Sequence, residues 1–367
     1  NDRAAATRAY TAYVERYPAP HAAAIDARQA LADLARDSGD TSGRRRWLEE
    51  VIAADAAAGS QRTDRSRYLA AHGALELARP HDDLARAIKL TVPLDQSLLA
   101  KKTATEQALT GYSRAAQYGI AEVTTAAGWA MADLYRDLGK SLLESERPPS
   151  LSEEEREAYD VLLEEQAFPF EEKAIEIHEA NARRAADGVY DEWVRKSYTS
   201  LAELKPARYA RTELDPGPAA PAAPDPEAPA PDSPVPPEFA AQLEVARASL
   251  EAGRDEEAVG ELNAALSQYS ASAEGHNRLG IAYRRLGRMT EARAAYEQAI
   301  AADHAMPAPH RNLAVLLDLY LAQPGPALEQ YEQYQRLDGG ADAQAGPWLE
   351  ELRARMKQTQ RTADAQP

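Results

Sequence analysis

The sequence of 367 residues contains no cysteine. Disulfide bonds and thiolate chemistry are therefore excluded, and the chain would survive an oxidising compartment unchanged. Aromatic residues make up only 7% of the chain, whereas alanine is abundant at positions with helical spacing, which favours close packing of helices over pairing of strands. The sequence has no run of 18 apolar residues, so it predicts no transmembrane span.

The charge is strongly one-sided, with 59 acidic residues against 42 basic residues and a net charge of -17. Nucleic acids and anionic membranes would repel such a chain, so we expect neither as a partner of the whole protein. The sequence begins at Asn1 without a methionine, and we expect that the true N-terminus has been removed, together with any signal peptide or membrane anchor that it carried. The absence of cysteine permits a periplasmic location, and a cytoplasmic location is the alternative.

Long windows of the sequence carry apolar residues at helical spacing, and few show the alternation of strands. The chain is therefore predicted to be all-α, an α-solenoid of helical hairpins in two parts. The boundary between the parts is a stretch rich in Pro and Ala at residues 214–237, where Pro recurs every second or third position. Proline removes a backbone donor and clashes with the preceding turn, so this stretch is predicted to be an extended linker.

A repeat with a period of about 34 residues follows the linker. Gly253 and Gly287 are one period apart, and three further pairs share this spacing. A third copy needs one extra residue, which the sequence places in its inter-helix turn near 323–325. Small residues alternating with a large one at this period are typical of tetratricopeptide repeats (TPR). Residues 238–360 are thus predicted to be a TPR domain of three repeats, with a capping helix over 347–356. The pairs and the third-copy residues are Ala258 and Ala292, Leu262 and Tyr296, Ala265 and Ala299, then Ala327, Tyr331 and Tyr334.

Residues 1–213 show a weaker version of the same pattern. Residues 131–139 align without gaps with residues 279–287, and residues 31–39 share their eight-residue spacing from an apolar residue to Gly. This part is therefore predicted to be a degenerate TPR-like solenoid. It should include a long helix from about Ser152, punctuated at Pro169, and a final helix over 190–204.

Motifs of catalysis and metal binding are incomplete in this sequence. Gly139, Lys140 and Ser141 resemble the end of a phosphate-binding loop, but the first glycine of that motif is missing and the surroundings are helical. His178 lacks a second histidine four residues later. The neighbouring carboxylates lie on helices and are interpreted as solvated faces. The sequence therefore predicts a protein that is not an enzyme and has no cofactor or metal.

A concave surface remains as the candidate site. In a TPR superhelix it is lined by the first helix of each repeat. Arginine and asparagine there suit an extended peptide, because they bind carboxylates and backbone amides. The alternative is that several of these arginines simply pair with Glu along their own helices. The predicted partner-binding residues are Arg247, Asn277, Arg278, Ile281, Arg284, Arg311, Asn312 and Val315.

Two stretches carry a narrower resemblance. Residues 163–209, which include the run Phe168, Pro169, Phe170, and residues 312–340 resemble bacterial TPR proteins regarded as components of TonB systems. The resemblance implies a cell-envelope location and a partner near the TonB/ExbB/ExbD energy-transduction proteins, and it carries no catalytic residue.

The sequence thus predicts a non-catalytic scaffold for protein–protein interaction that binds a partner peptide in the TPR groove, accessory to a TonB-type system. The alternative function is an assembly or structural component of a motility or secretion machine, which docks through the N-terminal solenoid.

Overall fold

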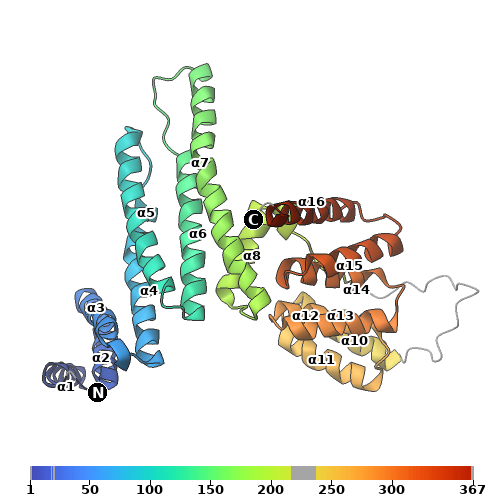
Figure 1. Ribbon diagram of the computed structural model, residues 1–367, viewed down its shortest axis with the longest axis horizontal. Coiled ribbons are helices and arrows are strands. Elements are labelled where there is room, and N and C mark those ends of the chain that lie inside the picture. Colours follow the sequence, from blue (N-terminus) through green and yellow to red (C-terminus); the bar gives the residue numbers. More distant parts are fainter. Residues whose placement is uncertain (1, 18, 20, 216–236, 365–367) are drawn as a thin grey trace, which may run out of the picture. The chain divides into compact units, whose positions relative to one another are not determined.

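The computed structural model describes residues 2–17, 19, 21–215 and 237–364. Over these residues all regular structure is helical, with no strand, as Figure 1 shows. The prediction of an all-α solenoid is confirmed. The chain divides into an N-terminal unit, residues 1–181 with 191–197, and a C-terminal unit, residues 182–190 with 198–367. The first predicted part, residues 1–213, is therefore shared between the two units.

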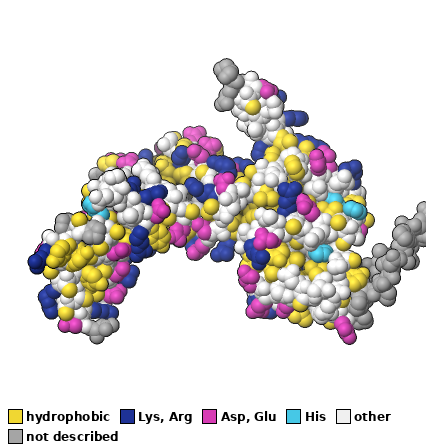
Figure 2. Space-filling view, turned by 60° about the horizontal axis from the view of Figure 1, so that its bottom comes forward, with side chains coloured by type: hydrophobic (Ala, Val, Ile, Leu, Met, Phe, Trp, Pro, Cys, Tyr) yellow, Lys and Arg dark blue, Asp and Glu magenta, His cyan; other side chains and the backbone are white. Residues whose placement is uncertain are grey.

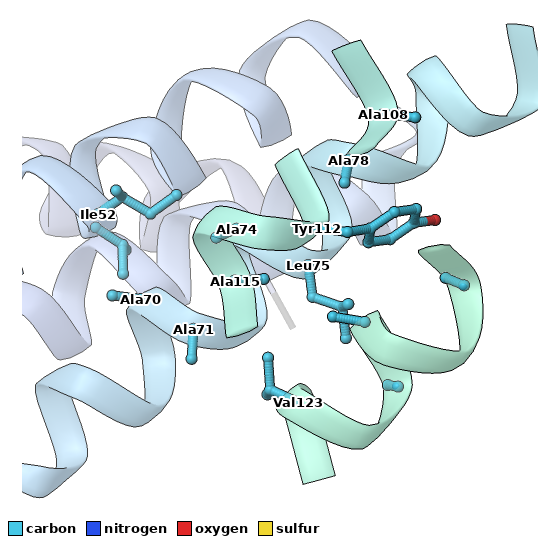
Figure 3. Close-up of a cluster of buried hydrophobic side chains, with 14 of the residues drawn as sticks. Ile52, Ala70, Ala71, Ala74, Leu75, Ala78, Ala108, Tyr112, Ala115 and Val123 are labelled. Atoms are coloured by element: carbon cyan, nitrogen blue, oxygen red, sulfur yellow. The ribbon is translucent and has the colours of Figure 1, made fainter. Parts of the chain in front are cut away.

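Alanine dominates the core of the N-terminal unit, where α4, α5 and α6 meet (Figure 3). A Cβ at Gly111 of α5 would lie 2.8 Å from the Cβ of Ala78 on α4, so these two helices cross at the closest distance that the backbones allow. Tyr112 and Leu75 fill the wider space beside this crossing. Small residues at the crossing thus make the hairpins of this unit compact. Its helices are α1 (Arg3–Arg16), α2 (His21–Ser38), α3 (Thr41–Ala57), the short 3₁₀ helix η1 (Gly59–Gln61), α4 (Asp64–Ala87), α5 (Leu94–Ala116), α6 (Ala121–Leu143), α7 (Glu153–Ala182) and the start of α8 (Glu192–Leu204).

The long helix α7 is continuous through Pro169, so the predicted interruption there is wrong. It begins after Ser152, whose backbone N–H donates to Glu155 and whose hydroxyl accepts from the Glu155 N–H. Leu163 and Ala167 are buried before Pro169, and Ala174 is buried after it. Burial on both sides of the proline holds the helix together where one backbone hydrogen bond is missing.

The C-terminal unit stacks three helical hairpins and a final helix, as Figure 1 shows. In the middle hairpin the ring of Tyr296 lies so close to Gly280 that a Cβ there would overlap a ring carbon. The glycine and the tyrosine of this repeat therefore form one packing contact between the two helices of the hairpin. The helices of this unit are the short 3₁₀ helix η2 (Arg183–Asp187), the end of α8, α9 (Pro206–Tyr209), α10 (Pro237–Glu251), α11 (Asp255–Gln268), α12 (Ala273–Arg285), α13 (Met289–Ala302), α14 (Pro307–Val315), the π-helical η3 (Leu316–Tyr320), α15 (Pro324–Leu337) and α16 (Ala345–Asp364).

The extra residue of the third repeat lies in η3, at the end of its first helix, and not in the inter-helix turn near 323–325 as predicted. The first helices of the second and third repeats begin after Ser272 and Met306, which are one regular period apart. Their second helices begin after Arg288 and Gln323, and this separation is longer by one residue. A π-helical turn absorbs one inserted residue without breaking the helix. The insertion therefore leaves the register of the preceding α14 unchanged.

The predicted linker at 214–237 lies mostly outside the described residues, which omit 216–236. Its first two residues, Leu214 and Asp215, are described, and Pro237 begins α10. The predicted domain limits at 213 and 238 therefore stay a prediction.

Candidate functional site

An extended segment, Arg211–Asp215, follows α9 and lies against the hairpins of its own C-terminal unit. Aromatic packing fixes the chain just before it. The Tyr198 hydroxyl donates to the carbonyl of Leu319 at 2.7 Å, and the rings of Tyr198 and Tyr320 are 4.6 Å apart. Tyr209 packs its edge against Tyr198, with ring centroids 6.3 Å apart. These contacts position the chain so that the segment lies against α12, α14 and α16.

Two asparagines bind the backbone of the segment at Leu214. Asn312 accepts from the Leu214 N–H at 2.7 Å and donates to the Leu214 carbonyl at 2.9 Å. Asn277 donates to the same carbonyl at 3.1 Å and accepts from Asn312 at 2.9 Å. Both asparagine side chains are fully buried. Because these bonds involve only main-chain atoms of the segment, they recognise an extended backbone whatever its side chain at this position.

Glu213 places a carboxylate between Arg284 of α12 and Tyr296 of α13, and hydrogen-bonds to both. Burial is the largest single effect on the pKa of the Arg284 guanidinium and lowers it, but the charge and hydrogen bond of Glu213, together with Tyr320 and Tyr296, raise it, and the net shift is upward. Burial, followed by the charge of Glu213, raises the pKa of Tyr296. The arginine is thus held charged and the hydroxyl protonated, so both donate to the carboxylate.

The two neighbouring positions of the segment are also bound. The Asp215 carboxylate accepts from Nε of Arg278, with both oxygens at 3.1 Å. Arg311 donates to the Thr212 carbonyl at 3.0 Å and pairs with Asp342, also at 3.0 Å. The segment is therefore bound by main-chain contacts at Thr212 and Leu214 and by charged contacts at Glu213 and Asp215.

At the other end of the segment the charges are exchanged: the segment supplies a cation, Arg211, and the surrounding helices supply the carboxylates. Its guanidinium donates to Asp318 at 2.5 Å and to Glu351 at 2.6 Å, and its side chain is fully buried. It also lies over the rings of Tyr331 and Trp348, at 5.5 and 5.6 Å from their centroids. Pairing with two carboxylates and two aromatic faces makes this position a firm anchor.

Five of the eight predicted partner-binding residues contact this segment. We call these five the segment-binding surface, and they are Asn277, Arg278, Arg284, Arg311 and Asn312.

The other three predicted residues are placed differently. Arg247 pairs with Glu244 and Glu251 on its own helix, as the alternative interpretation of the sequence expects. Ile281 and Val315 are buried, at 3% and 2% exposure. The assignment of a partner to any of the eight residues stays a prediction.

Sequence reasoning missed the segment itself and its acidic receptor, Asp318 with Glu351. Arg211, Glu213 and Asp215 carry charges at every second position, which puts them on one side of an extended chain. This alternation next to the proline-rich stretch is the signal that could have indicated a docked segment. Tyr296 was predicted as a packing residue of the repeat, but the hydrogen bond between its hydroxyl and Glu213 was not predicted.

Other candidate chemistry is sparse in the described part of the chain. His178 is fully buried beside Ser197, and burial, with a smaller effect of Arg136, lowers the pKa of this histidine to about 4. Residues 2–17, 19, 21–215 and 237–364 contain no group of three or more side chains suited to a metal ion. Within the same residues, no helix combines the length and the apolar character needed to cross a bilayer.

The N-terminal unit has two hollows of its own. One, of about 550 Å³, is lined by residues of α3, α4 and α5, among them His81 and Arg114. The other, of about 510 Å³, lies between α2, α3 and α4 and includes Arg45 and Arg79. These two arginines make no hydrogen bond or ion pair with any other residue that the structure describes. Basic groups are therefore available on this unit as well.

Comparison with known protein families finds a match over part of the chain. The family model described as "Tetratricopeptide repeat-like domain" matches residues 150–318. This match agrees with the predicted repeat and confirms a TPR-like domain. A search of curated proteins gives no significant match.

Several solved structures are similar to this chain at low identity. The TPR domain of P58(IPK) has 13% identity, a TM-score of 0.30, and coverage of 98% of this chain and 95% of that chain. Yeast Tom70 has 12% identity and a TM-score of 0.30, with coverage of 97% and 82%. A TPR2AB-domain:pHSP90 complex of yeast Sti1 has 13% identity and a TM-score of 0.29, with coverage of 89% and 96%. At these scores no binding property is transferred to this chain.

Proposed function

We propose that the chain is a non-catalytic scaffold for protein–protein interaction, and that its segment-binding surface recognises an extended acidic stretch of a partner protein. One observation carries the proposal: this surface already holds an extended acidic stretch, Glu213–Asp215, by its main chain and both carboxylates. A surface that satisfies the backbone of one strand-like peptide can satisfy that of another with the same charges.

Charge complementarity supports an acidic partner despite the net charge of -17. On the face in Figure 2, acidic and basic side chains are interspersed, without one large field of a single sign. At physiological salt, repulsion between exposed charges that are more than about 8 Å apart is largely screened. Contacts with Arg278 and Arg284 therefore dominate over the net charge once a peptide is bound.

The proposal is tested by selecting displayed peptides on the full chain and measuring each selected peptide separately. We expect selected peptides to carry two carboxylates two positions apart, and to bind the R278Q/R284Q variant at least about tenfold more weakly. Arg247→Gln is the matched control, because among the described residues Arg247 pairs with Glu244 and Glu251 of its own helix, and it should leave binding unchanged. Peptides that bind the R278Q/R284Q variant as tightly as the natural chain would contradict the proposal.

The place of action is proposed on the sequence resemblance alone. It supports a periplasmic scaffold accessory to a TonB/ExbB/ExbD-type system, whose components would supply the acidic stretch. Purification of the tagged full chain from its own cells should then recover at least one of these components. Recovery of none of them after chemical cross-linking would remove this part of the proposal.

A second function is favoured by the hollows of the N-terminal unit. Arg45 and Arg79 stand unpaired among the described residues at one of them, which supports docking through this unit, as in an assembly component of a motility or secretion machine. The R45E/R79E variant of the full chain should then lose its partner, whereas R278Q/R284Q should keep it. The opposite result would favour the segment-binding surface.

A further inference from the structure

The segment Arg211–Asp215 has the same chemistry as the ligand proposed above, and it belongs to this chain. It uses the main-chain bonds of Asn277 and Asn312 and the charges of Arg278 and Arg284. A partner stretch that used the same groups could not bind while the segment stays in place. The contacts of the segment therefore also determine how a partner gains access.

The three charged side chains of the segment become more exposed from Arg211 to Asp215. The Arg211 side chain is fully buried, Glu213 is 7% exposed, and Asp215 is 25% exposed. Arg211 is also enclosed by two carboxylates and two aromatic rings. Release from the Asp215 end therefore breaks the more exposed contacts first and leaves the Arg211 anchor in place.

We infer that Glu213–Asp215 is a built-in competitor, and that a partner binds by replacing these three residues with its own Glu-x-Asp stretch. This inference rests on the proposed function of the segment-binding surface. The middle position of the stretch can be any residue with a backbone N–H, because the structure binds Leu214 through its N–H and carbonyl. The two outer positions need carboxylates that reach Arg284 with Tyr296 and Arg278.

Tethering explains why such a competitor is effective with so few contacts. A segment held next to its site by the anchor at Arg211 has an effective concentration in the millimolar range. A free stretch of equal chemistry must exceed that concentration or make additional contacts. Weakening the built-in segment should therefore raise the fraction of chains whose site is open. The apparent affinity for a free peptide should rise in proportion to that fraction.

The test measures binding of one probe, a fluorescent peptide with the sequence of residues 213–215, blocked at both ends. Its affinity is compared between the natural full chain and the E213Q/D215N variant. Each charged contact that is lost weakens docking of the segment about tenfold, so the probe should bind the variant up to about 100-fold more tightly. Circular dichroism checks that the helices are retained.

A second variant releases the segment without changing its charge. Leu214→Pro removes the N–H that donates to Asn312, and proline favours an extended conformation of the residue before it. This variant should also bind the probe more tightly. Adding Arg284→Gln to either released variant should abolish the gain, because the probe then loses the partner of its glutamate.

The outcomes separate this inference from the proposed function. Equal affinity of the natural chain and both released variants, with loss in R284Q, would overturn the built-in competitor and leave the binding surface standing. Absence of binding to the released variants would overturn both. A gain that survives R284Q would place the probe elsewhere and overturn the assigned site.

Discussion

Asn312→Ala should free the segment Arg211–Asp215 without unfolding the repeats around it. The fully buried amide of Asn312 makes three hydrogen bonds, two to the main chain of Leu214 and one to Asn277. Each is worth about 1 kcal/mol net, so docking of the segment should weaken by about 2 kcal/mol, or about 30-fold. Hydrogen exchange of the Leu214 amide measures this directly, because that N–H is bonded only when the segment is docked. Its protection should fall by the same factor.

The matched control is Asn263→Ala. Asn263 lies exposed on α11 and makes one long hydrogen bond, 3.4 Å, to Tyr283, so its loss should leave the Leu214 amide unchanged. Equal protection of that amide in the natural chain and in N312A would refute the reasoning. Fast exchange in the natural chain would refute it too, because the segment would then not be docked.

Three further predictions concern the stability of the helices in the two units. Lys101→Ala removes an ammonium that is 1% exposed and donates to a backbone carbonyl at 2.8 Å and to a carboxylate at 2.7 Å. Urea denaturation should show a loss of about 3 kcal/mol, whereas Lys140→Ala, at an exposed pair, should change stability by less than about 0.5 kcal/mol. Burial lowers the pKa of His178 to about 4, so between this pKa and the ordinary value of about 6.5 only the unfolded chain takes up the proton. Stability should therefore fall by about 2 kcal/mol from pH 7.5 to pH 5 in the natural chain relative to His178→Asn; parallel pH profiles of the two proteins would contradict this. Gly280→Ala should lower the melting temperature, at a cost of about 1–3 kcal/mol, because the added Cβ overlaps an aromatic ring. Gly260→Ala, with nothing within 4 Å, should raise stability by about 0.5–1 kcal/mol. A gain in both variants would show that helix propensity outweighs crowding at Gly280, and would contradict the prediction.

The helical class and the repeats could be predicted from the sequence because each depends on local contacts. The pairing of Gly280 with Tyr296 appears as a fixed spacing within its hairpin. The position of the inserted residue could not be predicted, because an insertion in η3 and one in the turn give the same spacing on either side. The continuity of α7 through Pro169 depends on burial by neighbouring helices, which a single-sequence pattern does not contain.

The candidate site could be predicted from the sequence only in part. Asn277, Arg284 and Asn312 were found from their phase in the repeat, which sets the face of the helix on which a residue lies. The bound segment could not be found in this way, because Arg211–Asp215 is not helical and contacts residues 63 to 140 positions away. Docking of such a segment depends on tertiary charge pairing, which leaves no periodic signal.

The most direct test of a carboxylate-binding surface that holds its own segment is a double-mutant cycle between Glu213 and Arg284. The free energy of unfolding is measured by urea denaturation for the natural chain, E213Q, R284Q and the double variant. Where the two units unfold in separate transitions, the transition used is the one whose midpoint R284Q shifts. We expect the two substitutions to be non-additive, with a coupling of about 1–3 kcal/mol, because each removes the same contact. Strict additivity would show that the two side chains do not meet in solution, and would contradict the account.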